Sequence, residues 1–262
     1  MLKKGLLVWC NSRGVIFLQD VRPTLLIQWR NTWTFRAKTY SFRVHQGVVK
    51  TFFKWCLNSD LIQTNPAERL PKVTVDHDQK QPFSPEEMDK ILQAVGSENL
   101  QWDDLKRYRV RAVILLMRWS GLACMDAATL ERSALDKHDR IICRRNKTGS
   151  HVHVRIPKYV ADTLRGLPDS EYFFWDGRMQ KSSAANRVQD WLRAVFTEAG
   201  VKGTSHQFRH TFAVEMLKKG VALEDVSKLL GHKTTGVTEK HYSAWVAARQ
   251  ERLDKVVQAA WD

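Results

Sequence analysis

The sequence predicts a mainly helical protein with one small β-sheet, an α+β fold, divided into two domains. Three observations predict it. Apolar residues recur at helical spacing along most of the chain, two strand-like runs flank a turn near its middle, and a polar, proline-flanked segment separates two helical regions. A chain of 262 residues that is 43% hydrophobic, with 10 Trp and 11 Phe, can build two cores, so disorder is not expected.

Basic side chains are concentrated in the first part of the chain. The sequence has 42 Lys and Arg against 28 Asp and Glu, a formal net charge of +14. Residues 1–75 hold 12 basic and 3 acidic side chains, a balance of +9, which leaves +5 for the remainder. A merely solubilising charge fits poorly with so few acids. The balance favours a polyanionic partner, a nucleic acid before a membrane.

The first domain, residues 1–75, is expected to be helical and to grip DNA. Residues 22–33 and 36–59 have apolar residues at helical spacing, with basic residues among the aromatic ones. We assign the apolar face to the core. The candidate phosphate contacts are the basic side chains of the second helix: Arg36, Lys38, Arg43, Lys50 and Lys54. Phosphate contacts set affinity rather than sequence choice. Residues 76–82 are expected to be a linker.

The second domain, residues 83–262, opens on a helix start signal in FSPEEMDKIL. Ser84 is expected to cap the helix, Pro85 to occupy its first position, and Glu87 to complete a capping box. Another amphipathic helix is expected at 105–119, ended by a Ser-Gly pair.

The middle of this domain has strand signals. RIICRRN and HVHVRIP flank KTGS at 147–150, which predicts a β-hairpin with Gly149 in the turn. EYFFW at 171–175 is expected to be a third short strand. His151 and His153 alternate on one strand face and are expected to lie at the surface. Helices are expected after this point, at 182–199, 205–219, 222–230 and 234–243, with an amphipathic tail at 245–260.

The cysteines favour a reducing compartment. The chain has Cys10, Cys56, Cys124 and Cys143 and no CxxC pair, which argues against a zinc ribbon and against a disulfide scaffold. No apolar run is long enough to cross a bilayer, and the opening MLKKGLLVWC lacks the features of a signal peptide. The sequence therefore predicts a cytoplasmic protein.

A cluster of basic residues opens the segment SHQFRHTFAVEML at 205–217. His206, Arg209 and His210 share one face of the predicted helix, as a metal site or a phosphate pocket would require. A metal site is disfavoured because Arg209 would repel the cation and no Glu lies between the histidines as in HExxH. We expect His210 to pack against or orient its neighbours. Downstream, LLGH ends at His232 and Tyr242 follows ten residues later.

This order of His-x-x-Arg-His, Leu-Gly-His and Tyr, with a lysine-bearing hairpin upstream, resembles the catalytic signature of the tyrosine recombinase (phage integrase) family. Residues 22–75 resemble the family's SAM-like helical core-binding domain, and residues 83–262 resemble its catalytic domain. The resemblance implies a site-specific recombinase of a mobile element that cleaves and rejoins DNA through a covalent 3′-phosphotyrosine. It implies no metal and no cofactor.

The roles that the resemblance implies agree with the chemistry of these side chains. Tyr242 would be the nucleophile, and Arg209 presents a planar fork to two phosphate oxygens. His232 would donate to a nonbridging oxygen, and His206 would accept the phenolic proton or bind the phosphate. Lys147, at the hairpin turn, would protonate the leaving 5′ oxygen.

One residue of the signature is missing. The family has a second arginine in a Thr/Ser-Gly-Leu-Arg segment, but SGLACMDAATL at 120–130 places Ala123 there. Asp126 matches the acidic residue that supports the family's arginines. Three explanations stay open: a deliberate substitution, a natural lineage with another cation, or a DNA-binding relative that no longer cuts. Arg118 and Arg132 are the nearest arginines in sequence.

The resemblance also implies an assembly. We expect a monomer in solution, a homotetramer on two synapsed DNA sites, and a nucleoid-associated location in the cytoplasm. The tail at 245–260 is a candidate for docking onto a neighbouring protomer. The first helix of the core-binding domain looks short or missing, so the alternatives are a minimal recombinase and a reading frame clipped at its N-terminus.

Overall fold

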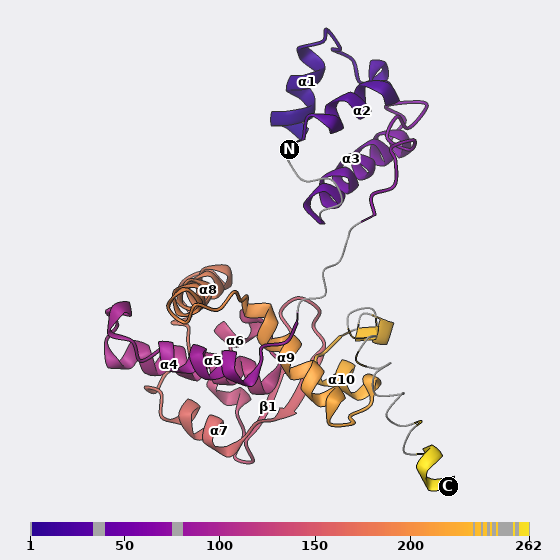
Figure 1. Cartoon of the computed structure of the whole chain (residues 1–262). Coiled ribbons are helices and arrows are strands. Elements are labelled where there is room, and N and C mark those ends of the chain that lie inside the picture. Colours follow the sequence, from indigo (N-terminus) through magenta and orange to yellow (C-terminus); the bar gives the residue numbers. More distant parts are fainter. Residues whose placement is uncertain are drawn as a thin grey trace. The chain divides into compact units, whose positions relative to one another are not determined.

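The computed structural model describes residues 2–33, 40–74, 81–232, 234–236, 238–239, 242, 245, 254 and 257–261. The chain divides into two compact units, Met1–Asp78 and Gln79–Asp262 (Figure 1). Helices dominate both units, and the described residues form a single named sheet of two strands. The predicted fold class, mainly α with a small sheet, is confirmed. Most of the linker expected at 76–82 lies outside the described residues.

The first unit is a small helical body. It begins with a short π-helix at Leu2–Leu6 that continues into α1 (Leu7–Asn11), and it goes on to α2 (Pro23–Asn31) and α3 (Tyr40–Asn58). The helices expected at 22–33 and 36–59 are present wherever the structure describes them. One stripe of α3 is buried at spacings of three and four residues: Phe42, Gln46, Val49, Phe53 and Cys56.

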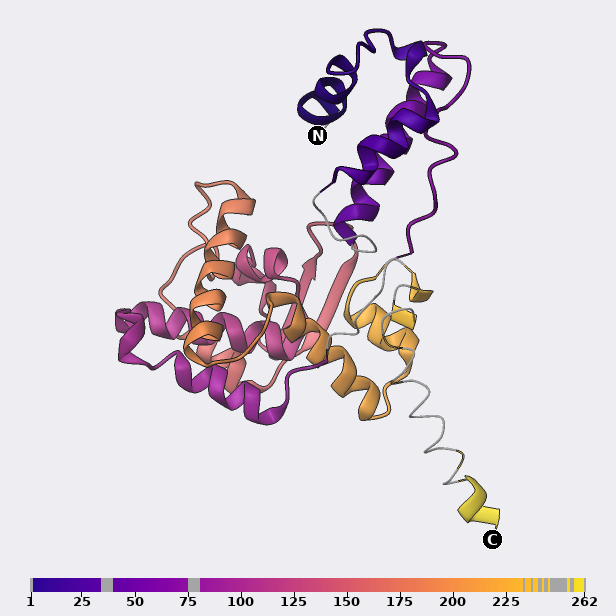
Figure 2. The same cartoon turned by 45° about the horizontal axis from the view of Figure 1, so that its top comes forward.

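The second unit is built around α5 (Asp104–Ser120). Residues 112–117 of this helix are buried without a break, so it is covered on all sides rather than on one stripe. It packs against α6 (Cys124–Ala128), α7 (Lys158–Arg165), α8 (Lys181–Glu198) and α9 (Ser205–Lys218), as Figures 1 and 2 show. The helix α10 (Leu223–Leu229) packs against α9.

The start of this unit follows the sequence signals closely. In front of α4 (Pro85–Ala94), the Ser84 hydroxyl accepts from the Glu87 backbone N–H at 3.1 Å. The Glu87 carboxylate accepts from the Ser84 N–H at 2.9 Å, which completes the predicted capping box. The helix expected at 105–119 is α5, and Gly121 ends it in the left-handed conformation at φ 65°.

The predicted β-hairpin is confirmed. Strands β1 (Arg140–Arg144) and β2 (His151–Arg155) pair antiparallel, with Arg140 opposite Arg155 and Arg144 opposite His151. Gly149 has φ +68° in the turn, a conformation that favours glycine. His151 and His153 are exposed, as expected, while the valines between and after them face the core.

The strand expected at 171–175 is wrong. Tyr172 makes one isolated bridge with Glu131, and the segment belongs to no strand. Its apolar pattern has another cause, because Phe173 and Phe174 are buried in the core from a loop. The short helices α6 and α7 were not predicted, while α8, α9 and α10 match the expected 182–199, 205–219 and 222–230. Of the helix expected at 234–243, the described residues 235, 236, 238, 239 and 242 are helical, and 237, 240, 241 and 243 lie outside the described residues. Most of the tail expected at 245–260 also lies outside them.

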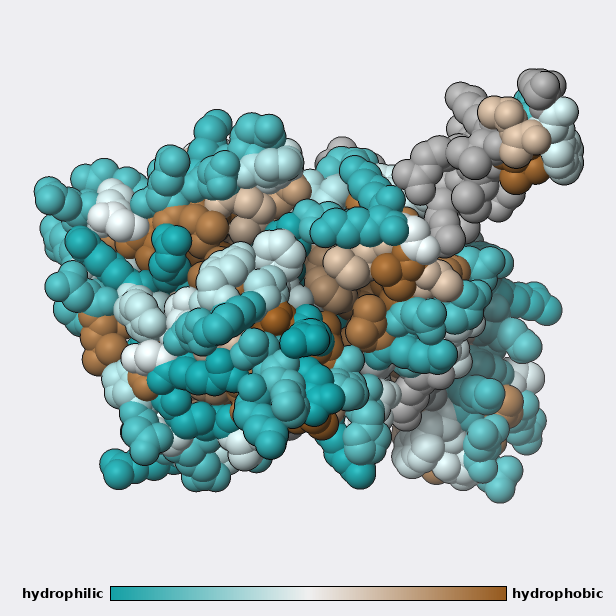
Figure 3. Space-filling view, turned by 90° about the horizontal axis from the view of Figure 1, so that it is seen from below, coloured by the Kyte–Doolittle hydropathy of each residue, from teal (hydrophilic) through white to brown (hydrophobic). Residues whose placement is uncertain are grey.

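The face in Figure 3 is mostly hydrophilic, with hydrophobic side chains scattered among the hydrophilic ones. Among the described residues, no helix combines the length and the apolar character needed to cross a membrane.

The capping box at the start of α4 gives a prediction about stability. Ser84→Ala removes the acceptor for the Glu87 N–H, so the free energy of unfolding should fall by about 1 kcal/mol. Urea unfolding followed by circular dichroism measures the loss. Ser182→Ala is a matched control, because its exposed hydroxyl makes only a 3.4 Å contact with Gln180 and should leave the midpoint unchanged. Equal effects of the two substitutions would contradict the cap assignment.

Candidate active site

Arg209 is held inside the second unit by two helix ends. Its side chain, 2% exposed, projects from the first turns of α9. Nη1 donates to the carbonyl of Gly121 at 2.7 Å, and Nη2 donates to the carbonyl of Leu230 at 2.6 Å. Gly121 and Leu230 are the C-caps of α5 and α10, where the helix dipoles are negative and favour a cation.

The bend at Gly121 is required for this arrangement. A Cβ at Gly121 would lie 2.6 Å from a ring carbon of Phe212 and 3.0 Å from Leu230. The positive φ and the lack of space therefore both demand glycine where α5 ends and its last carbonyl meets Arg209.

Tyr242 is buried beside Arg209. The residue is 3% exposed, and the His210 ring stacks on its ring with centroids 5.0 Å apart and an interplanar angle of 22°. Burial raises the pKa of Tyr242 to about 12, and the nearby positive charge of Arg209 opposes that rise. The phenol is therefore protonated at neutral pH. The expectation that His210 packs against its neighbours agrees with this contact.

The two other histidines of the predicted site differ in exposure. His232 is half-buried, and its Nδ1 lies 2.7 Å from the Thr238 hydroxyl. The backbone N–H of His232 donates to the Ser227 carbonyl at 3.0 Å, which fixes the turn after α10. His206 is exposed in the first turn of α9.

Asp126 connects α6 to the hairpin. Its carboxylate, buried on α6, accepts from Nε of Arg145 at 3.0 Å, from the Asn146 backbone N–H at 2.8 Å and from the Asn146 side chain at 3.1 Å. Lys147 follows directly and is exposed at the turn. Asp126 therefore holds the base of the turn that carries Lys147.

Arg145 is the site residue that the sequence analysis missed. Its Nη1 donates at 2.8 Å to the carbonyl of Leu230, the acceptor that Arg209 also uses. Burial, and next the charge of Arg145, lower the pKa of Arg209 to about 10, against the opposing effects of Tyr242 and Asp126. A signal was present, because Arg145 continues the inward alternation of Ile141 and Cys143 along the strand.

The two arginines nearest to Ala123 in sequence do not replace the missing one. Arg118 pairs with Glu215 and lies over the Trp119 ring. Arg132 donates to the carbonyls of Leu167 and Pro168 at 2.7 and 2.6 Å. Neither makes a described contact with Asp126. Ala123 itself is the N-cap of α6, without a side-chain hydrogen bond.

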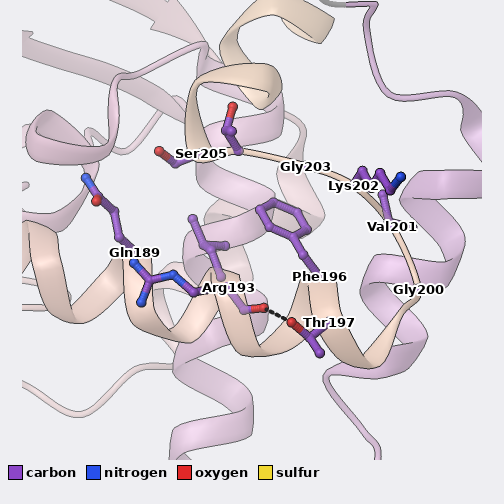
Figure 4. Close-up of a pocket in the computed structure, with 11 residues that line it drawn as sticks. Gln189, Arg193, Phe196, Thr197, Gly200, Val201, Lys202, Gly203 and Ser205 are labelled. Atoms are coloured by element: carbon purple, nitrogen blue, oxygen red, sulfur yellow. Dashed lines mark hydrogen bonds between the residues drawn. The ribbon is translucent and has the colours of Figure 1, made fainter. Parts of the chain in front are cut away.

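A separate hollow flanks the start of α9. It has a volume of about 510 Å³ and lies between α8 and residues 200–205, with Arg193 and Lys202 among its lining side chains (Figure 4). Arg209 and Tyr242 do not line it, so it is not part of the candidate active site.

The described residues contain no group of three His, Cys, Asp or Glu side chains placed to hold a metal ion. His206, His210 and His232 thus form no such ligand set in the described part of the chain.

The first unit carries the candidate DNA contacts. Arg43, Lys50 and Lys54 recur at spacings of seven and four residues, so they share one face of α3 beside its buried stripe. Arg43 and Lys54 are exposed, while the Lys50 ammonium donates to the Leu70 carbonyl at 3.1 Å. Arg36 and Lys38 lie outside the described residues.

Known proteins resemble this chain in sequence. Residues 81–248 match the model of the phage integrase family. Tyrosine recombinase XerA of Thermococcus kodakarensis is 29% identical over 198 residues, which cover 72% of this chain and 67% of XerA. Tyrosine recombinase XerC of Leptospira interrogans is 26% identical over 226 residues, or 81% of this chain and 69% of XerC.

Solved structures share the fold. A lambda integrase (75–356) dimer bound to a COC′ core site superposes with a TM-score of 0.70 at 16% identity, covering 89% of this chain and 84% of that one. The Tn1549 transposon integrase in complex with a circular intermediate DNA gives 0.65 at 18% identity, with coverages of 90% and 86%. Because the family match extends over more than half of the sequence, the chain belongs to the phage integrase family of tyrosine recombinases, enzymes that break and rejoin DNA.

Proposed function

We propose that this chain is a site-specific DNA recombinase that cuts and rejoins strands through a covalent 3′-phosphotyrosine on Tyr242. One observation carries the proposal: a buried phenol lies in the electrostatic field of a buried guanidinium that two helix ends already hold in place. Family membership supplies the reaction class, and this pair supplies a nucleophile and a cation for the phosphate.

The reaction balances without a cofactor. The Tyr242 oxygen attacks the phosphorus, its proton passes to His206, and the bond from phosphorus to the 5′ oxygen breaks. Lys147 gives a proton to that leaving oxygen. Rejoining reverses each step, with a 5′ hydroxyl as the nucleophile. The phosphotyrosine conserves the bond energy, so no nucleotide is consumed.

Charge stabilisation is assigned to two residues of the predicted set. Arg209 faces two phosphate oxygens with its planar fork, and His232 donates to a nonbridging oxygen. The Thr238 hydroxyl, 2.7 Å from Nδ1 of His232, orients that ring.

Binding of double-stranded DNA must uncover the nucleophile. Tyr242 is 3% exposed and lies against His210, so it cannot reach a phosphate until this packing rearranges. The basic face of α3 supplies sequence-independent contacts to the duplex. The chain is proposed to be a monomer in solution and a homotetramer on two synapsed sites; the lambda integrase relative was solved as a DNA-bound dimer.

Ala123 favours a second candidate function. If no other cation replaces the family's arginine, the chain is a DNA-binding relative that does not cut. Loss of one charge-stabilising group at a transition state costs about 10²- to 10³-fold in rate. This alternative predicts specific retention of DNA without any covalent product.

The nucleophile can be tested with a nicked suicide duplex, from which the cleaved fragment diffuses away. The recognition sequence in this duplex is first selected from random-sequence DNA by binding to the Tyr242→Phe protein. The unmodified protein should form a covalent adduct that survives denaturing electrophoresis, and Tyr242→Phe should form none because it lacks the attacking oxygen. Tyr159→Phe, which changes an exposed phenol, is the control and should keep adduct formation. An adduct in Tyr242→Phe would refute the assignment.

The acid can be tested by changing the leaving group. Lys147→Ala should slow adduct formation on ordinary DNA by about 10²- to 10⁴-fold. When the scissile phosphate carries a bridging 5′ sulfur, the departing strand leaves as a 5′ thiolate and needs no proton, so the same variant should recover on this substrate. Lys181→Ala provides a control lysine, whose ammonium donates to Asn146 at 3.3 Å. If the Lys147→Ala deficit persists on the sulfur substrate, Lys147 has another role.

The burial of Tyr242 predicts a pH dependence of stability. Its pKa in the folded protein, about 12, lies above the value of about 10 for an exposed phenol, so unfolding favours ionisation at alkaline pH. The stabilisation is complete below about pH 10 and is lost between about pH 10 and pH 12. From about pH 9 to about pH 10.5, the native protein should lose about 1 kcal/mol more unfolding free energy than Tyr242→Phe. Urea unfolding at each pH measures these free energies. If the unfolding free energies of the two proteins change with pH by the same amount, the burial of the phenol is contradicted.

A further inference from the structure

We infer that Arg145 supplies the second phosphate-binding guanidinium of this site. It replaces the arginine of the family's signature, whose position Ala123 occupies here. The cation thus comes from the base of the β-hairpin turn, not from the segment that follows α5. The inference rests on the proposed function, since it names a further catalytic residue of the same reaction.

Arg145 and Arg209 share one of their anchoring acceptors. Each guanidinium donates to the Leu230 carbonyl, at 2.8 Å from Arg145 and 2.6 Å from Arg209. Both are at least nine-tenths buried, with 9% and 2% of their surface exposed. Two planar forks that share one acceptor present their remaining N–H groups to a common region.

The side chains around the Leu230 carbonyl carry an excess of positive charge, which an anion can neutralise. The group contains two guanidiniums and one contacting carboxylate, Asp126, and the uncharged Tyr242 phenol adds no negative charge. An excess positive charge away from water is unfavourable until an anion compensates it. A DNA phosphodiester carries one negative charge, which completes the balance.

Arg145 has donors to spare for that anion. Nε is used by Asp126 and Nη1 by Leu230, whereas Nη2 has no partner among the described residues. If the ion pair of Arg145 with Asp126 were purely structural, Arg145 would not need to donate to the Leu230 carbonyl, which Arg209 already uses.

The neighbouring backbone is shaped around the Arg145 stem. Gly231, directly before His232, has φ +62°, and a Cβ there would lie 2.7 Å from Cδ of Arg145 and 2.9 Å from Val152. Because Gly231 has no side chain, the Arg145 side chain can pass close to it and reach the Leu230 carbonyl. Figure 1 shows the hairpin alongside α10, and β2 packs against that helix.

The hairpin turn joins this cation to the proposed acid. The Arg145 N–H donates to the Ser150 carbonyl at 2.9 Å, and its carbonyl accepts from the Gly149 N–H at 2.8 Å. Asp126 holds Arg145 and Asn146 together, and Lys147 follows. One turn thus carries both a phosphate clamp and the group that protonates the leaving oxygen.

The experiment removes the negative charge from the substrate. Adduct formation is timed on the selected suicide duplex with either an ordinary scissile phosphodiester or a neutral methylphosphonate. Arg145→Gln should slow the reaction on the phosphodiester by about 10²- to 10³-fold. On the methylphosphonate, which has no charge to neutralise, most of this deficit should disappear. A deficit of equal size on both substrates, or none on either, would overturn the inference.

Two further variants separate a catalytic from a structural role. Ala123→Arg in the Arg145→Gln background returns a guanidinium beside Asp126 and should restore roughly tenfold or more of the rate. Arg132→Gln is the matched control, because the Arg132 guanidinium likewise donates to backbone carbonyls, those of Leu167 and Pro168, and makes no described contact with Asp126. It should react like the native protein on both substrates. If Arg145→Gln does not fold, Arg145→Lys serves instead, with a smaller deficit of the same substrate dependence.

Binding separates failure of this inference from failure of the proposed function. If the native protein forms no adduct, the proposed function fails, but Arg145 can still be tested by titrating the two duplexes. The native protein should bind the phosphodiester more tightly than the methylphosphonate, and Arg145→Gln should reduce that preference. An unchanged preference would overturn the role of Arg145 as a phosphate ligand.

Discussion

The carbonyl oxygen of Leu230 accepts a hydrogen bond from Arg145 and another from Arg209, and the rest of the site is arranged around this shared acceptor. It brings together the C-terminal end of α10, the first turns of α9 and the base of the hairpin turn. Two buried guanidiniums repel one another, so the arrangement depends on compensation by Asp126 and by the negative ends of two helices. This compensation is partial, which is what a site for a transient anion requires.

The local features of the fold were predictable because short-range rules decide them. The capping box at Ser84 and the turn at Gly149 depend on residues within a few positions of each other. The expected strand at 171–175 failed because burial in a loop produces the same apolar run as a strand. The five-residue helix α6 is too short for helical periodicity to identify it.

The site was predictable only in part, and for a related reason. Arg209, His232, Tyr242 and Lys147 follow from an ordered motif, although their roles remain proposals. Arg145 could not be found from that motif, since its importance comes from contacts with residues 19 and 85 positions away in sequence. Closeness to Ala123 in sequence does not bring Arg118 or Arg132 to Asp126, because their guanidiniums are held by other partners. Arg145 instead reaches Asp126 from the base of the hairpin turn, directly after β1.

The most direct test is a crystal structure of the Tyr242→Phe protein bound to its selected duplex, which holds the scissile phosphate without cutting it. We expect the phosphate to lie over the Leu230 carbonyl, with nonbridging oxygens within hydrogen-bond distance of both Arg145 and Arg209 and with the ring of residue 242 turned toward the phosphorus. A phosphate bound elsewhere, with Arg145 still committed to Asp126 and Leu230 alone, would contradict the account.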